Sequence, residues 1–135
     1  MKNYPQKILL AWSEAIAGNT KIRDFLTKNG YPELGMFCFA LRNQDSARTW
    51  LVENKHMALM ALINGVEGSE DAIVWLKNSG FKTLSMVALA GDNDLPAFNW
   101  LKNKDILFAK IAKEIRIVKN EIEDNNADPH RRGSN

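Results

Sequence analysis

The residue types that most often carry acid–base, nucleophilic or metal chemistry are sparse in this chain of 135 residues. It has two histidines, His56 and His130, and one cysteine, Cys38. Histidine is the usual proton-transfer residue near neutral pH, but His56 stands in a repeated apolar column, where we expect a half-buried ring, and His130 lies in a polar tail. One cysteine and two distant histidines lack the ligand spacing of a zinc site. We therefore predict no metal site and expect Cys38 to be a buried, unreactive thiol.

Pairs of carboxylates are the remaining candidates for acid–base catalysis. The clearest are Glu70-Asp71 and Asp92 with Asp94. Both pairs stand where a helix is predicted to begin, and negative charge there stabilises the helix N-terminus. Glycine-rich phosphate loops are absent. We therefore predict a protein that is not an enzyme and needs no cofactor, and an enzyme of unknown type is the third hypothesis.

A repeat of 25 residues organises the chain. Trp50, Trp75 and Trp100 follow one another at this spacing, each is followed by Leu, and Phe25-Leu26 stands one period earlier. A strict period of this kind is typical of stacked supersecondary units, each of which uses its neighbour to complete its core. We expect the aromatic column to lie in that core, so that Trp75→Ala would cost about 3–5 kcal/mol.

Apolar residues recur at helical spacing on both sides of each aromatic residue, which predicts two short helices in every period. Capping residues before them and Gly or Asn after them set their ends. The predicted helices cover residues 5–17, 20–29, 32–42, 46–54, 56–65, 70–78, 81–91, 95–103 and 105–123. The predicted fold class is all-α, a right-handed α-α solenoid of about four and a half two-helix repeats.

These repeats form one predicted domain, 1–123, whose last helix extends over about 105–123. Residues 124–135 are polar and are predicted to be a disordered tail. The first residues lack an apolar signal segment, and no apolar run approaches the length of a membrane span. We therefore expect a cytoplasmic location and no membrane contact.

The segment 88–101, which reads ALAGDNDLPAFNWL, resembles the helix–turn–helix units of HEAT-like and armadillo-like solenoids. The resemblance extends over the chain to about residue 113. Units of those families run about 40–47 residues, whereas these are shorter and closer to leucine-rich variant repeats. The resemblance implies a scaffold that presents a surface to a macromolecular partner.

Positions that vary between repeats while the core columns hold are predicted to form the partner surface. The candidates are Arg48, Val52, Ile73, Val74, Lys77, Phe98 and Lys102. Apolar residues among them would form a patch suited to a protein partner, although Ile73 could instead pack against an adjoining helix. The leading hypothesis is a non-enzymatic protein–protein interaction module.

Lysines collect at the turns that follow the aromatic helices, which gives the alternative hypothesis. They are Lys28, Lys55, Lys77, Lys82, Lys102 and Lys104. A lysine-lined edge can follow a phosphate backbone, so a nucleic-acid-binding repeat is the second hypothesis. The net charge is only +2, and lysines near helix C-termini also complement the helix dipole, so this reading ranks below protein binding.

The last predicted helix outruns the repeat and continues an apolar stripe. The stripe comprises Phe108, Ile111, Ile115, Val118 and Ile122. It either folds back as a terminal cap or is buried against another chain. Ile115, Val118 and Ile122 are therefore candidates for homo-oligomer assembly, and Glu at Val118 and Ile122 is expected to leave the repeat body intact.

Overall fold

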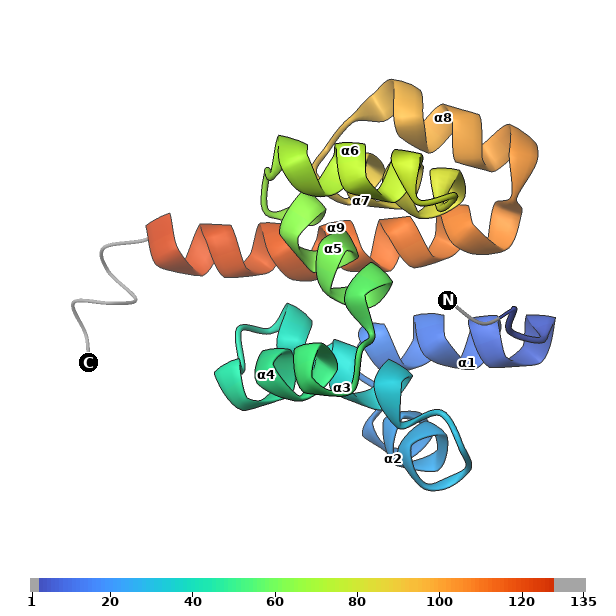
Figure 1. Ribbon diagram of the computed structural model, residues 1–135, viewed down its shortest axis with the longest axis vertical. Coiled ribbons are helices and arrows are strands. Elements are labelled where there is room, and N and C mark those ends of the chain that lie inside the picture. Colours follow the sequence, from blue (N-terminus) through green and yellow to red (C-terminus); the bar gives the residue numbers. More distant parts are fainter. Residues whose placement is uncertain (1–2, 128–135) are drawn as a thin grey trace.

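The computed structural model describes residues 3–127, and within them every regular element is a helix (Figure 1). The helices are α1 (Gln6–Ile16), α2 (Thr20–Lys28), α3 (Pro32–Leu41), α4 (Asp45–Glu53), α5 (Met57–Val66), α6 (Glu70–Asn78), α7 (Lys82–Gly91), α8 (Leu95–Lys104) and α9 (Ile106–Ala127). Each predicted boundary lies within one residue of the observed one, except the end of α9. Neighbouring helices pack in sequence, so the prediction of an all-α helical solenoid is confirmed.

Side-chain caps and turns explain these boundaries. Asn19, Ser69 and Asp94 each accept a hydrogen bond from the backbone N–H three residues later, at 3.1, 3.1 and 2.9 Å. These bonds satisfy N–H groups that lack a partner in the first turn. Gly30 and Gly80 end the turns after α2 and α6 with φ of 97° and 87°, a conformation that costs glycine little.

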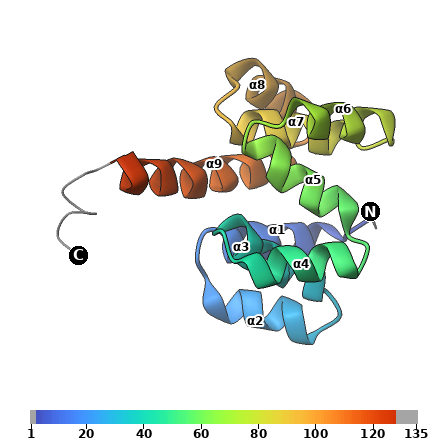
Figure 2. The same ribbon diagram turned by 60° about the vertical axis from the view of Figure 1, so that its left-hand side comes forward.

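The last helix lies between the two halves of the array. It packs against α7 and α8 on one side and against α1 and α3 on the other. In Figure 1, α9 crosses the middle of the molecule, with α1 to α4 on one side and α6 to α8 on the other, and Figure 2 shows the same order. The odd-numbered helices therefore form an inner row whose two ends meet.

This closure corrects the assembly prediction. Ile115 and Val118 are 0% and 2% exposed, and Ile122 packs partly buried against the same core. The prediction that they need a second chain to cover them is wrong, because α9 turns this stripe towards its own array, where α1 and α7 pack against it. The terminal-cap alternative describes the observed arrangement.

The buried column is the leucine that follows each aromatic residue. Leu26, Leu51, Leu76 and Leu101 are all 0% exposed. Trp75, in contrast, is 41% exposed, so the prediction that the aromatic column occupies the core is wrong. One residue along a helix is a rotation of about 100°, which carries the ring to the edge of the core.

At that edge the aromatic rings cover the start of the next helix. Trp50 stacks on His56 with ring centroids 5.6 Å apart, and Trp75 stacks on Phe81 at 6.1 Å. His56 is thus half-buried, as predicted.

The end of α9 also differs from the prediction. Residues 124–127 continue the helix, so the predicted boundary of a disordered tail at 124 is wrong, and the rest of that tail, 128–135, lies outside the described residues. No helix in the described part of the chain is both long enough and apolar enough to cross a membrane.

Candidate partner-binding site

Two clefts open at the same place in alternate repeats. The α4–α5 cleft has a volume of about 390 Å³ and is lined by Arg48, Thr49, Val52, Glu53, Met60 and Asn64. The α8–α9 cleft has a volume of about 340 Å³ and is lined by Phe98, Lys102, Ile106, Leu107, Ala109, Lys110, Lys113 and Glu114. Two periods of the repeat separate Arg48 from Phe98, Val52 from Lys102, Met60 from Lys110 and Asn64 from Glu114. The two clefts are therefore equivalent sites.

One repeat position explains why the helix pairs α4–α5 and α8–α9 leave a cleft between them. It carries the long side chains of Met60 and Lys110 in the second and fourth repeats but Gly35 and Ser85, both buried, in the first and third. Gly35 lies against Thr27 so closely that an added Cβ would clash. A small residue thus lets the two helices of a repeat approach, whereas a long one occupies that space and leaves a cleft beside it.

The α4–α5 cleft continues into a larger depression on the other side of α5. That depression has a volume of about 490 Å³ and is lined by Met57, Met60, Ala61, Asn64, Ser69, Asp71, Ala72 and Trp75. Both cavities share Met60 and Asn64. We call the two together the α5 groove, because one face of α5 forms the floor while α4 and α6 form the walls.

The α5 groove exposes large apolar side chains from all three helices. Val52 on α4 is 47% exposed, Met57 on α5 is 45% exposed and Trp75 on α6 is 41% exposed. Among the described helices, α4 and α6 make no extensive contact with each other, so neither wall closes over the floor. Exposed apolar residues of this size around one groove are typical of an interaction surface.

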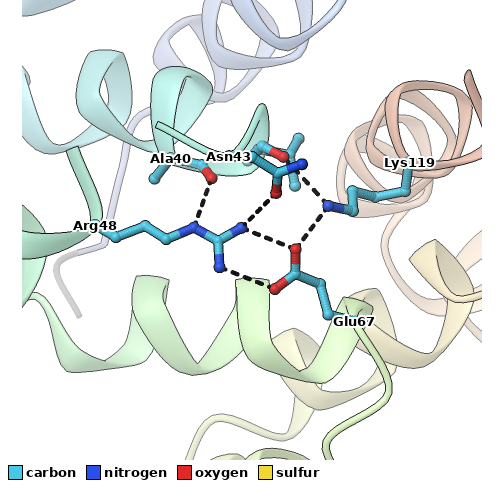
Figure 3. Close-up of polar contacts among 6 residues, drawn as sticks. Ala40, Asn43, Arg48, Glu67 and Lys119 are labelled. Carbon is cyan, nitrogen blue, oxygen red and sulfur yellow. Dashed lines mark hydrogen bonds and ion pairs between the residues drawn. The ribbon is translucent and has the colours of Figure 1, made fainter. Parts of the chain in front are cut away.

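A cluster of charged residues fixes the α4 wall of the groove (Figure 3). Arg48 donates to both carboxylate oxygens of Glu67, from Nη1 at 3.0 Å and from Nη2 at 2.8 Å. Its Nη2 and Nε also donate to Asn43 Oδ1 and to the Ala40 carbonyl, each at 3.0 Å. Lys119 Nζ on α9 donates to Glu67 Oε2 at 2.7 Å. The carboxylate therefore ties α4 to α9 across the α5–α6 turn.

The pKa of Glu67 reflects this environment. Burial raises it, but hydrogen bonds from Arg48 and Lys119 and their positive charges lower it, and the net result is a pKa below the ordinary value of 4.5. The hydrogen bond to Glu67 raises the pKa of Arg48, against a smaller opposing effect of burial. Sequence reasoning missed Glu67 and Lys119, because they stand 52 residues apart and no repeat column pairs them.

We expect Glu67→Gln to lower the free energy of unfolding at pH 7 by about 1–3 kcal/mol, because Arg48 and Lys119 keep their charges and lose the carboxylate. The contribution of a group with a lowered pKa is fully present above its unfolded value of 4.5 and is lost as pH falls through the lower folded value. Urea unfolding at several pH values should show the two proteins converging at low pH. Glu121→Gln, at an exposed position of α9, is the control, and an equal loss there would contradict the role of Glu67.

The structure separates the seven predicted partner residues. Arg48 and Val52 line the α4–α5 cleft, while Phe98 and Lys102 line the α8–α9 cleft. Ile73 is 9% exposed and its Cδ1 atom lies against Gly65, so its prediction as a surface residue is wrong and the packing alternative holds.

Val74 and Lys77 are exposed but line neither cleft. Sequence reasoning missed Trp75 as a groove residue, because its column was predicted to lie in the core, and it assigned no role to Met57. For Met60 it allowed an adaptable surface but favoured packing in the core. The signal that distinguishes Met60 is its size at a position where other repeats carry Gly35 and Ser85.

Among the described residues, no group of three or more His, Cys, Asp or Glu side chains could hold a metal ion. Cys38 is buried, as predicted, and burial raises the pKa of its thiol to about 12. The lysines of the predicted nucleic-acid edge are all exposed: Lys28, Lys55, Lys77, Lys82, Lys102 and Lys104. Nucleic-acid binding by that edge stays a prediction.

Comparison of the chain with protein-family models, with curated proteins and with solved structures gave no significant match in any of the three. The class of protein that the fold defines is a helical-repeat protein.

Proposed function

We propose that the protein is a non-enzymatic interaction module of HEAT-like or armadillo-like character, which binds an amphipathic helix of a partner protein in the α5 groove. The observation that carries the proposal is the face of α5 that lines both cavities, with Met57 exposed, between two helices that make no extensive contact with each other. Its floor residues Met57, Met60, Ala61 and Asn64 follow the spacing i, i+3, i+4 and i+7, which is the ridge pattern that another helix packs against.

The form of the groove favours a helix over an extended peptide. Extended peptides gain affinity by adding to the edge of a sheet, and the described residues contain no strand. A helix between α4 and α6 would instead repeat the packing that the array already uses. Methionine side chains adapt to varied apolar partners, and a large aromatic such as Trp75 is the residue type that most often dominates binding energy.

Charged residues at the rim of the α5 groove would fix the orientation of a bound helix. Glu53 on α4 and Asp71 on α6 line the two cavities, and Arg48 is held in place by Glu67. A partner helix with apolar residues on one face and basic residues beside them would match the carboxylates of Glu53 and Asp71. A cytoplasmic location is part of the same proposal.

The test uses helix-forming peptides selected from a displayed library against the intact chain. Binding should shift the methyl NMR signals of Met57 and Met60, while those of Met36 and Met86, on α3 and α7, stay in place. Val52→Glu should weaken the selected peptides by about tenfold or more, because it places a charge at an apolar contact. Val74→Glu, exposed on α6 and outside the groove, should leave binding unchanged.

Two results would overturn the proposal. One is a selection in which every bound peptide leaves the Met57 and Met60 signals unmoved. The other is an equal loss of binding in the Val52→Glu and Val74→Glu proteins. Both readouts require folded protein, which the far-ultraviolet circular dichroism of each variant verifies.

A further inference from the structure

The α8–α9 cleft differs from its equivalent in charge. Lys102, Lys110 and Lys113 line it, and the guanidinium of Arg116 lies 5.5 Å from the ring centroid of Phe98, another lining residue. Glu114 is the one carboxylate among the lining residues. Four cations thus gather around a single acid, in a chain whose whole net charge is only +2.

These cations have no carboxylate partner in the part of the chain that the structure describes: no ion pair within 4.0 Å joins Lys102, Lys110, Lys113 or Arg116 to an acidic side chain there. Arg48, at the equivalent cleft, is in contrast fully engaged with Glu67. The helix dipole does not account for Lys110 and Lys113 either, because they stand in the second turn of α9, which begins at Ile106, whereas the dipole stabilises positive charge only in the last turn of a helix.

The cleft between these cations is apolar. Ile106 at its mouth is 66% exposed, and Leu107 and Phe98 are partly buried beside it. Lys102 Nζ lies 5.6 Å from the centroid of the Phe98 ring, together with Arg116 at 5.5 Å. The exposed aliphatic side chain of Ile106 is matched by an apolar side chain of a partner and not by a phosphate backbone, which favours an acidic peptide with an apolar residue over a nucleic acid.

We propose that the α8–α9 cleft is a second docking surface, which binds an acidic segment of a partner protein that also carries a bulky apolar side chain. The carboxylates pair with Lys102, Lys110 and Lys113, while the apolar side chain covers Ile106 and enters the cleft. Complementary charge sets the choice of partner and speeds association, and the apolar contact supplies the burial that surface ion pairs alone do not. This surface is separate from the α5 groove, and its occupant has the opposite charge.

The test is a selection of random displayed peptides against the intact chain, followed by affinity measurements on synthetic copies of the selected sequences. One group of peptides should be enriched in Asp and Glu around at least one large apolar residue. The double variant Lys110→Glu, Lys113→Glu should weaken this group by about tenfold or more, and raising the salt to 1 M should weaken it as well, since the screening length falls to about 3 Å. Lys28→Glu with Lys77→Glu, two exposed lysines outside the cleft, should change little.

The α5 groove provides an independent control. Acidic peptides should bind the Val52→Glu protein normally, so failure of the groove proposal does not affect this result. The inference is overturned if no acidic group is enriched, or if both pairs of lysine substitutions weaken binding equally. It is also overturned if a fluorescein-labelled single-stranded oligonucleotide binds the cleft more tightly than any acidic peptide and Lys110→Glu, Lys113→Glu abolishes that binding.

Discussion

Val118→Glu is expected to destabilise the whole array, with a loss of at least about 4 kcal/mol in the free energy of unfolding, because it buries an unpaired charge. Val118 is 2% exposed on α9, and α9 packs between α1 and α7. A domain of this size has a total stability of about 5–15 kcal/mol, so a loss of this size should move the unfolding midpoint to a much lower urea concentration. Urea unfolding followed by circular dichroism measures the loss.

The neighbouring Ile117 is the matched control. It is 40% exposed on the same helix, so Ile117→Glu should stay within about 1 kcal/mol of the wild type. The pair also tests closure of the array. If α9 beyond the repeat were an independent extension, Val118→Glu would fray only that helix and leave the main transition in place, which would contradict the packing of α9 against α1.

The sequence could predict the helices because their causes are local. Caps such as Asn19 and Asp94, glycines in turns such as Gly30, and apolar spacing all act within a few residues. The return of α9 to α1 has no such local cause. A repeat column shows which residues correspond in successive units, but it does not indicate that the first and last helices, α1 and α9, contact each other.

The candidate site was likewise predictable only where its cause is local in the sequence. The variable positions at Arg48 and Val52 were found because a surface tolerates change between repeats. The floor of the α5 groove was not predicted, because methionine packs in cores as readily as it forms adaptable surfaces. In the structure Met57 is 45% exposed between α4 and α6, whereas Met60, at the bottom of the groove, is only 9% exposed. Lys119 also helps to fix the α4 wall of the groove. Its side chain is buried in an otherwise apolar stripe of α9, and its ion-pair partner Glu67 lies 52 residues away in the sequence.

Leu76→Ala is expected to cost about 3–5 kcal/mol, more than Trp75→Ala next to it, which should cost about 1–2 kcal/mol. Leu76 is 0% exposed, so its removal leaves a cavity that the surrounding helices fill only in part. Trp75 is 41% exposed and contacts Phe81 through one stacked face, so its loss removes burial at the edge of the core without emptying its centre.

The order of the two losses, measured by urea unfolding, decides which column holds the array together. A larger loss for Trp75→Ala would contradict the packing described above and restore the aromatic column to the core. The expected order has a functional consequence, because a tryptophan that contributes little to folding can be kept for binding. Trp75→Ala should then weaken a peptide bound in the α5 groove by a larger factor than Leu76→Ala does in the fraction of protein that stays folded, since Trp75 lines the groove and Leu76 does not reach the surface.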